Sequence, residues 1–463
     1  MTMPTPATQR KIVPFIVALS IFMEALDATI INTAIPSMSQ ALQVDAVDLK
    51  VALISYLLSL AIFIPISGWL ADKFGSKTIF TSALLIFTFS SLACGFAQDL
   101  SQLVIARFVQ GVGGALGLPV GRLIIARMFE RKHLIHVMGQ VIMVGSLGMM
   151  LGPAVGGVIT QHFSWQWIFW INIPVGIFSI FIARYWLTYE KPQPVPPLDK
   201  IGFVLFGASL SGFAFGLSAL SETTIDIRLA CLILLLSGLM LFFYIKHSRN
   251  QPHPIVKTHL LQLKTFKISV VGNLLSRVGF GGIPFLVPLL LQIGLGYSAQ
   301  ISGILLSPVA LGVLLAKPFA LPVLRKWGYK RVLFVNTFLA GMTMWCFMSV
   351  NPHTPLYSIG LITFMYGFIV SIQYTAMNSL AYAEIPSENL SAATSIMGTL
   401  QQLALSSGVA VSAVLIRIFS RDLVLTPQVF QSTFFTIGVI TLLSSFIFMQ
   451  LRPDDGEHML NKD

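Results

Sequence analysis

Charged residues are scarce in this chain of 463 residues: they make up 10% of it, and only 18 of them are Asp or Glu. An ordinary soluble domain is about 25% charged, so this chain cannot cover a water-facing surface with charge. Residues 133–183 and 332–383 contain no Asp, Glu, Lys or Arg. Each of these stretches is long enough for two bilayer crossings at about 20 residues apiece. The soluble classes are therefore excluded.

Cysteine is also rare, and histidine forms no cluster. Cys94, Cys231 and Cys346 lie in separate apolar segments without C-x-x-C spacing, which argues against a disulfide framework or a zinc site. The histidines follow no compact ligand spacing. No Walker loop, catalytic triad or nucleic-acid motif is present either. We therefore expect no metal, no cofactor, no enzymatic activity and no nucleic-acid partner.

Apolar runs of helical length, by contrast, recur along the whole chain, which is 55% hydrophobic with a mean hydropathy of +0.81. In hydrocarbon the backbone must satisfy its own hydrogen bonds, so runs of this length predict helices rather than strands. The first run is too long for the apolar region of a signal peptide and predicts an uncleaved span. The predicted spans are 12–35, 50–71, 78–97, 102–127, 137–160, 167–187, 201–220, 229–245, 266–292, 300–323, 332–350, 355–382, 392–416 and 429–451.

The basic residues predict the orientation of these fourteen spans. An even number of crossings places both chain ends on one side of the membrane. Of the 29 basic residues, eight do not lie on the side of the chain ends. Four of them lie in loops on the other side of the membrane (Lys50, Arg228, Arg417, Arg421) and four lie inside spans (Arg107, Arg122, Arg277, Lys317). Every other Lys and Arg lies on the side of the termini. The positive-inside rule then predicts cytoplasmic termini and a multi-pass protein of the cell inner membrane.

Two polar stretches divide the chain. Residues 188–200 include Pro192, Pro194, Pro196 and Pro197, which predict a stiff linker, and residues 246–265 form a second polar segment. The predicted organisation is an N-terminal six-helix half at 1–187, linkers with an inserted two-helix hairpin at 188–265, a C-terminal six-helix half at 266–451 and a tail at 452–463. The fold class is an all-α polytopic membrane protein with 14 transmembrane helices arranged 6+2+6.

The two halves show a faint sequence repeat. Gly75 follows the second span and Gly328 follows the tenth, an offset of 253 residues, and the same offset aligns Lys73 with Lys326. The same offset aligns Asp72 with Arg325, so the second copy of the repeat lacks the acid. Many transporters are built from such repeats, with the substrate site between them near the midplane of the membrane.

The first span carries the most unusual residues of the sequence. Of the 18 acids, only Glu24 and Asp27 lie well inside a predicted span, where ionisable residues are costly and are candidates for function. Three residues apart, they share a helix face. Counted from the span ends, Asp27 and Arg107 lie at depths that agree within one helical turn, so they can pair. The alternative is a static ion pair that only fixes two helices together.

Five segments, taken in order, resemble the major facilitator superfamily, and more closely its 14-span drug:H⁺ antiporter branch of the EmrB/QacA type. Within that branch the region around Gln292–Tyr297 is most similar to the HsrA-like and MdtD-like transporters. The segments are 26–36 of the first span, 68–77 (motif A), 107–115 (motif B), 148–157 (motif C, the antiporter signature) and 165–174 at the entry to the sixth span.

The resemblance implies roles for particular residues. Gating would belong to motif A, through Gly68, Asp72, Gly75 and Lys77; antiport would belong to motif C, through Gly148, Gly152, Pro153, Gly156 and Gly157; and proton coupling would belong to Asp27, Glu24 and Arg107. Each has a plainer alternative: Asp72 as a solvated loop charge, and the glycines as generic close packing of membrane helices.

The function that these observations favour is proton-coupled export of small organic compounds by alternating access, as in multidrug efflux. The alternatives are an importer or symporter of a metabolite such as an organic acid, and, from another class, a membrane receptor or enzyme.

The expected partners are the small-molecule substrate, protons and lipid. A monomer is the simplest assembly, and the sequence identifies no outer-membrane partner. Candidate cavity residues are Asn32, Gln110, Asn273, Arg277, Lys317, Gln373 and Asn378. Because the intramembrane basic residues outnumber the acids, neutral or anionic substrates are favoured over dications. The alternative is that Arg277 and Lys317 only snorkel or bond backbone carbonyls, which leaves the cavity neutral.

Overall fold

The structure is a computed structural model that describes residues 6–188, 194–222, 225–420 and 424–460, and these residues form helices and loops but no strand. Pro192 and Arg421 lie outside the described residues. The helices are α1 (Pro6–Leu42), α2 (Lys50–Phe74), α3 (Ser76–Gly95), α4 (Leu100–Met128), α5 (Arg131–His162), α6 (Trp167–Trp170), α7 (Asn172–Trp186), α8 (Lys200–Ala219), α9 (Ile227–Asn250), η1 (Thr258–Gln262), α10 (Lys264–Phe280), α11 (Ile283–Leu289), η2 (Leu290–Gly294), α12 (Ala299–Leu306), α13 (Pro308–Met348), α14 (Leu356–Ala381), η3 (Ser387–Asn389), α15 (Leu390–Phe419), α16 (Pro427–Ser444), η4 (Ser445–Gln450) and η5 (Glu457–Met459).

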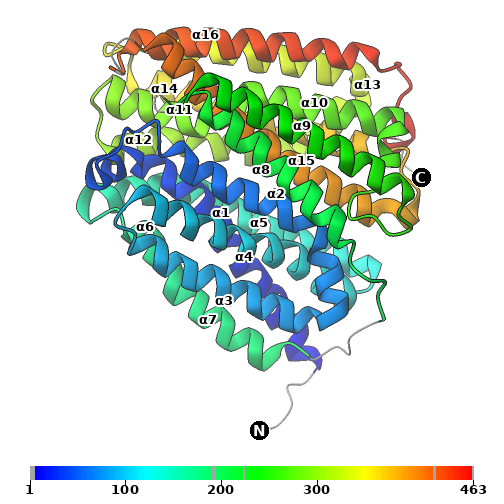
Figure 1. Cartoon of the computed structure of the whole chain (residues 1–463). Helices are drawn as coiled ribbons and strands as arrows, with labels where there is room; N and C mark the ends of the chain where they lie inside the picture. The colour runs from blue at the N-terminus through cyan, green and yellow to red at the C-terminus, as the bar shows by residue number, and fades with distance from the viewer. Residues whose placement is uncertain (1–5, 189–193, 223–224, 421–423, 461–463) are drawn as a thin grey trace.

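Within the described part of the chain, 13 helical segments are long and apolar enough to cross a membrane. The longest, Ala299–Met348, contains 50 residues and reverses direction at Gly328, so it crosses twice. The protein is thus a multi-pass membrane protein with fourteen crossings, as the sequence predicted. Both described chain ends lie at the same end of the bundle, called here the terminal end, and the opposite end is called the far end (Figure 1).

The turn at Gly328 differs from the prediction of a loop between 323 and 332. α13 is interrupted only at Gly328, whose φ of 70° and ψ of 164° are not helical. Gly75, at the related position of the first repeat, has a φ of 87° and separates α2 from α3. Both positions need a glycine because a side chain is strained at positive φ. The repeat read from the sequence therefore corresponds to two equivalent one-residue turns.

Two further boundaries differ from the predicted spans. α1 continues through Pro36 to Leu42, since neighbouring helices allow proline inside a membrane helix. Asp72 was placed in a loop, but α2 extends to Phe74 and includes it, because nothing ends that helix before Gly75. Asp72 therefore has a fixed position on a helix.

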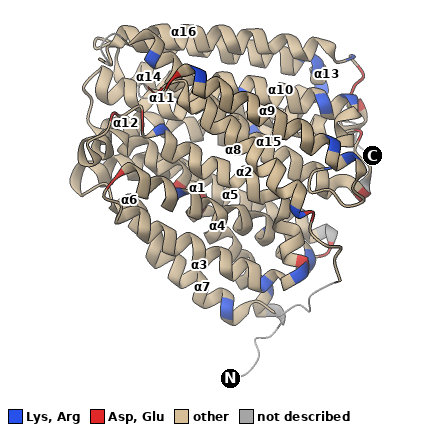
Figure 2. Cartoon of the chain, in the orientation of Figure 1, with Lys and Arg blue, Asp and Glu red and all other residues tan. Residues whose placement is uncertain are grey.

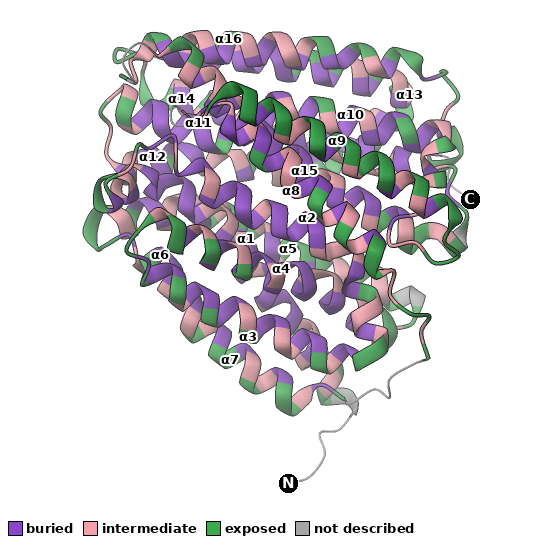
Figure 3. Ribbon diagram, in the orientation of Figure 1, coloured by how far each residue is buried: buried purple, intermediate pink, exposed green. Residues whose placement is uncertain are grey.

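The helices pack as two groups with a hairpin beside them (Figure 1). α1–α7 contact one another, α10–α16 contact one another, and α8 and α9 pair as a hairpin whose α8 also packs on α2 and α15. Most of α9 is exposed, as the green ribbon in Figure 3 shows. Such an apolar and exposed helix is suited to a lipid-facing position.

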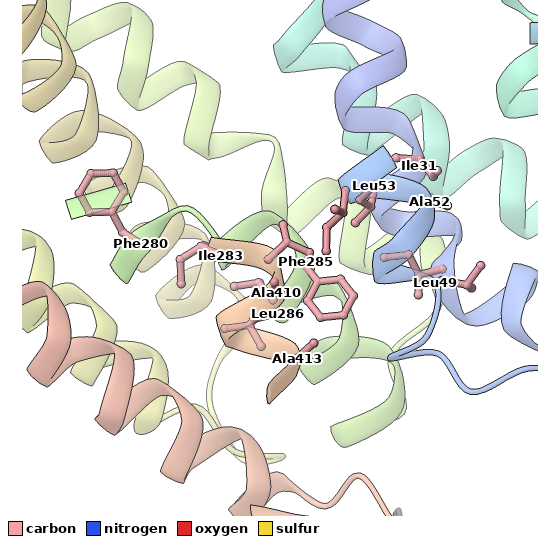
Figure 4. Packing of buried hydrophobic residues seen from close by; sticks show 14 of the residues in the cluster. Ile31, Leu49, Ala52, Leu53, Phe280, Ile283, Phe285, Leu286, Ala410 and Ala413 are labelled. Carbon is pink, nitrogen blue, oxygen red and sulfur yellow. The ribbon is translucent and has the colours of Figure 1, made fainter. Parts of the chain in front are cut away.

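A buried apolar cluster joins the two groups at the far end (Figure 4). Ile31, from α1, lies there with Leu53, from α2, on one side of the contact. Phe285 of α11 and Ala410 of α15 supply the other side. The structure is therefore closed between the two groups at the far end.

Lysines and arginines gather at the terminal end, as the blue segments in Figure 2 show. The far end carries fewer, and two of these, Lys50 and Arg417, are held in ion pairs. The charge asymmetry predicted from the loops is thus a property of the folded chain.

Candidate functional site

A buried polar cluster surrounds Asp27 in the middle of α1. Arg107 of α4 donates from Nη1 to Asp27 Oδ2 at 2.6 Å. Asp27 Oδ1 accepts from Gln110 Nε2 at 2.9 Å and from Asn172 Nδ2 of α7 at 2.8 Å. Gln110 Nε2 also donates to Ser91 Oγ of α3 at 2.8 Å. Four helices thus meet around one carboxylate, and the structure brings Asp27 and Arg107 together.

The environment of this ion pair excludes water. Asp27 is 0% exposed and Arg107 is 1% exposed. The Arg107 guanidinium lies 4.3 Å from the centre of the Tyr56 ring, a cation–π contact, while its Nε has no hydrogen-bond partner among the described residues. Removing one partner of such a pair is costly, because it leaves a charge buried alone. The cluster can therefore fix α1, α4 and α7 in one arrangement or, if Asp27 takes up a proton, release that arrangement.

Glu24 lies one turn of α1 closer to the terminal end and is held much more loosely. It is 8% exposed, and its Oε1 accepts one hydrogen bond, from Ser20 Oγ at 3.3 Å. The described residues offer it no ion-pair partner within 4 Å. Gly117 of α4 provides the space for this carboxyl, since a Cβ there would collide with Glu24 Oε1. Glu24 is thus the less constrained of the two intramembrane acids.

The glycines of the segment 148–157 form the contact surface of α5. A Cβ at Gly148, Gly152 or Gly156 would collide with α1, and a Cβ at Gly157 would collide with the backbone of Ala299 in α12. Small residues at intervals of four allow this close approach. Because α12 belongs to the other group, Gly157 lies where the two groups close at the far end. Pro153, whose carbonyl lies against Gly303 of α12, is part of the same contact.

The segment 68–77 forms a compact structure at the terminal end. Arg127 Nη2 of α4 donates to Asp72 Oδ1 at 2.5 Å, and Arg127 Nη1 donates to Ser76 Oγ at 2.9 Å. Lys77 Nζ donates to the carbonyl of Leu187 at 2.6 Å and so satisfies a backbone carbonyl at the end of α7. Gly68 faces open space. Asp72 therefore ties α2 to α4 within one group.

The far end is joined by ion pairs that sequence reasoning did not find. Arg417 Nη2 of α15 lies 2.9 Å from Asp48 Oδ1 and 3.1 Å from Asp45 Oδ2, both in the loop between α1 and α2. Lys50, 0% exposed, lies 2.6 Å from Glu222 Oε1 of the hairpin and 3.6 Å from Asp48. These contacts depend on loop conformation, which hydropathy does not report. They join both groups and the inserted hairpin.

The candidate cavity residues occupy several kinds of position. Gln110 belongs to the Asp27 cluster, and Asn32 donates to the carbonyl of Thr29 on its own helix at 3.2 Å. Gln373 lies between α13 and α14 and donates to Thr337 at 2.6 Å. Asn378 accepts from Gln401 of α15 at 2.8 Å, and Lys317 of α13 donates to Ser146 of α5 at 3.1 Å. The last of these joins the two groups near the middle of the bundle.

Asn172, Ser91 and Tyr56 complete the Asp27 cluster, and sequence reasoning did not assign them to it. Asn172 lies in the segment 165–174, which the motif comparison noted without giving it a chemical role. α6 and α7 are separated only at Ile171, whose φ of −58° and ψ of −25° are helical, so Asn172 lies on a continuous span. A polar amide within this apolar span is the sequence signal that could have identified Asn172.

Comparison with known proteins gives matches along nearly the whole chain. The family model described as Major Facilitator Superfamily matches residues 17–409 and 269–462. A protein named multidrug resistance protein MdtD from Enterobacter sp. (strain 638) is 34% identical over 451 residues, which is 96% of both chains. A protein named transport protein HsrA from Haemophilus influenzae is 33% identical over 460 residues, 99% of both chains.

Solved structures show the same fold at low sequence identity. A peptide transporter POT in complex with sulfate superposes with a TM-score of 0.73 at 14% identity, covering 96% of this chain and 95% of that one. The xylose transporter XylE from E. coli, in a partially occluded inward open conformation, gives 0.64 at 13% identity, with 96% and 98% covered. The arrangement of helices is therefore that of known membrane transporters.

Proposed function

The chain belongs to the major facilitator superfamily, and from that premise we propose that it exports small organic compounds across the inner membrane in exchange for protons. The observation that carries the proposal is the buried Asp27–Arg107 pair. A charged pair in the middle of a membrane bundle, with a second carboxyl one turn away, gives a site where a proton can change the packing of helices. The names of the relatives support small organic compounds as substrates.

The coupling step that we propose is an exchange of partners at Asp27. With Asp27 ionised, Arg107, Gln110 and Asn172 hold α1 against α4 and α7. A proton on Asp27 neutralises the carboxylate, so the ion pair with Arg107 is lost and the hydrogen bonds that hold α1 against α4 and α7 weaken. Glu24, closer to the terminal end and more exposed, would pass protons to and from Asp27.

The structure supports alternating access with one end closed. Contacts that join the two groups include the apolar cluster and the Arg417 ion pairs at the far end and, near the middle of the bundle, Lys317 with Ser146. The far-end contacts must separate for the site to open there. The division at residues 187, 265 and 451 stays a prediction, and in this proposal the parts on either side of the hairpin move as the two rocking units.

The experiment that tests the transport activity is counterflow in proteoliposomes. Liposomes loaded with an unlabelled compound from a small library are diluted into a trace of the same labelled compound. Transient accumulation of label that needs the protein is expected for at least one compound, because exchange through a carrier needs no energy source. A library without any such compound, in liposomes shown to contain folded protein, would contradict the proposal.

The orientation that we propose places the terminal end in the cytoplasm. Reporter fusions after residue 195, after residue 260 and at residue 463 are expected to be active as cytoplasmic fusions, and a fusion after Asp226 is expected to be active as a periplasmic one. The reason is the excess of Lys and Arg at the terminal end (Figure 2). A cytoplasmic signal at Asp226 would contradict both the orientation and the hairpin.

A gating role for Asp72 predicts an asymmetric effect of two substitutions. Asp72→Asn removes the ion pair between α2 and α4 and is expected to reduce initial transport rates by about tenfold, the equivalent of 1.4 kcal/mol. Arg325→Gln is the matched control at the related position of the other repeat, where Arg325 Nε donates to the carbonyl of Leu460. Small and equal effects of both substitutions on transport rate would indicate that Asp72 is merely a surface charge.

A further inference from the structure

Arg277 in α10 is a buried cation that pairs with no carboxylate of the described residues. It is 5% exposed, and none of the ion pairs between described residues includes it. Between Lys264 and Leu451 the sequence holds three acids, Glu384, Glu388 and Asp422, all outside the predicted spans. An isolated charge in a membrane bundle is expensive and is retained where it serves a function.

The protein contacts of Arg277 occupy only part of its guanidinium. Its Nε donates to Asn273 Oδ1 at 2.5 Å, and its flat face lies 3.7 Å from the centre of the Tyr374 ring of α14. Neither Nη atom appears in a hydrogen bond between described residues. The edge of the fork that binds a carboxylate with two parallel hydrogen bonds is therefore not used by the protein.

Other donors on the same face of α10 also lack partners. Asn273 Nδ2 and Ser269 Oγ are buried and have no hydrogen-bond partner among the described residues. Ser269, Asn273 and Arg277 follow one another at intervals of four, so they form one stripe along the helix. Of the unsatisfied groups, Nη and Nδ2 can only donate, and a hydroxyl can also donate. The ligand that satisfies such a stripe is an acceptor with negative charge.

Arg277 stands at the position of the second half that is equivalent to Glu24 in the first half. The offset of 253 that aligns Gly75 with Gly328 also aligns Glu24 with Arg277 and Ser20 with Asn273. A hydrogen bond joins each pair along its helix, in opposite directions: Ser20 donates to Glu24, whereas Arg277 donates to Asn273. In transporters built from repeats, the substrate lies between equivalent helices. The two halves thus present an acid and a base at related positions.

We propose that Arg277 and Asn273 bind the carboxylate group of an organic anion, with the aromatic surface of Tyr374 and Phe280 beside them. The rings of Phe280 and Tyr374 lie 5.8 Å apart and suit an aromatic or apolar body attached to the carboxylate. This inference rests on the proposed function, because it names the chemical class of the substrate that the site would move. Glu24 disfavours a second negative charge on that substrate.

The test is binding to the purified protein in detergent, with naphthalene-2-carboxylate, the matched carboxamide and a naphthyl trimethylammonium compound as probes. Binding is read from the concentration that half-saturates the rise in melting temperature. Wild-type protein is expected to bind the carboxylate at least about tenfold more tightly than the carboxamide, and the cation least, because only the carboxylate forms a charge-assisted pair.

Substitutions identify the residue responsible. Arg277→Gln is expected to remove the preference for carboxylate, Arg277→Lys to keep part of it and Asn273→Ala to weaken it. Arg325→Gln, which removes an arginine that binds the Leu460 carbonyl at the terminal end, is the matched control and is expected to leave the preference intact. The preference is a ratio of affinities, so it can be measured in any variant that retains a cooperative melting transition. Asn273→Ala and Arg277→Lys keep the test possible if Arg277→Gln does not fold.

Three outcomes would overturn the inference: equal binding of carboxylate and carboxamide, a preference that persists in Arg277→Gln, or no binding of the carboxylate at millimolar concentration. Binding in detergent needs neither transport nor a proton gradient. A protein that prefers the carboxylate but shows no counterflow would therefore contradict the proposed function and leave this site standing.

Discussion

Asp27→Asn is expected to abolish transport driven by a pH gradient while leaving exchange of substrate in counterflow. The amide keeps the size of the side chain but holds neither the charge that Arg107 pairs with nor an exchangeable acid proton. The driven component should fall by at least about 100-fold, since breaking a buried pair costs about 3–5 kcal/mol. The readouts are uptake with and without an imposed pH gradient in the same proteoliposomes.

Two companion variants separate coupling from folding. Asp27→Asn leaves the buried charge of Arg107 without its carboxylate, so Asp27→Asn combined with Arg107→Gln is expected to recover thermal stability but remain uncoupled. Glu24→Gln is expected to have a smaller effect and to change the pH profile, because the one hydrogen bond that Glu24 makes with the described residues comes from Ser20. Full proton-driven transport by Asp27→Asn would contradict the assignment and favour the static ion pair.

Gly157→Leu is expected to open the far end. A side chain at Gly157 collides with the backbone of Ala299, so α5 and α12 must separate there. Overpacking of this kind costs about 1–3 kcal/mol, enough to shift a two-state equilibrium by about 5- to 150-fold. The probe is Ser302→Cys in a background where Cys94, Cys231 and Cys346 are serine, because Ser302 is fully buried in α12.

Reaction of that cysteine with a water-soluble maleimide, in detergent, should be at least about fivefold faster in Gly157→Leu than in the parent, since the open population sets the rate. Gly139→Leu is the matched control on the same helix, because a Cβ there meets nothing within 4 Å. Equal labelling of the two leucine variants would show that Gly157 does not govern closure and that the glycines serve only general packing.

The sequence predicted the spans and part of the site for physical reasons that can be named. Hydropathy alone locates fourteen crossings because the bilayer demands a fixed length of apolar helix. The membership inferred from five ordered motifs is confirmed by the family model and by the relatives. Depth along two helices was enough to suggest the contact between Asp27 and Arg107, since each residue advances a helix by a constant rise.

Features that depend on rotation about a helix axis or on loop conformation were out of reach. Asn172 of α7 donates to Asp27 of α1, a contact that depends on how each helix is rotated about its axis and that no periodic pattern contains. Lys50 looked like a loop charge, yet it is buried in an ion pair with Glu222, which lies between α8 and α9. Asp72 looked like a loop acid because the end of α2 is set by the positive φ of a single glycine. In each case tertiary packing, rather than local preference, decides the position.

The most direct test of proton-coupled export is the sign of the pH change inside proteoliposomes when a substrate found by counterflow is added outside. Antiport predicts that the interior becomes more alkaline as substrate enters and protons leave, at a rate that depends on the wild-type protein. Asp27→Asn and protein-free liposomes should show no such alkalinisation. An interior that becomes acidic only with the protein present would indicate symport, and substrate entry without a pH change would indicate an uncoupled carrier; either result would contradict the account.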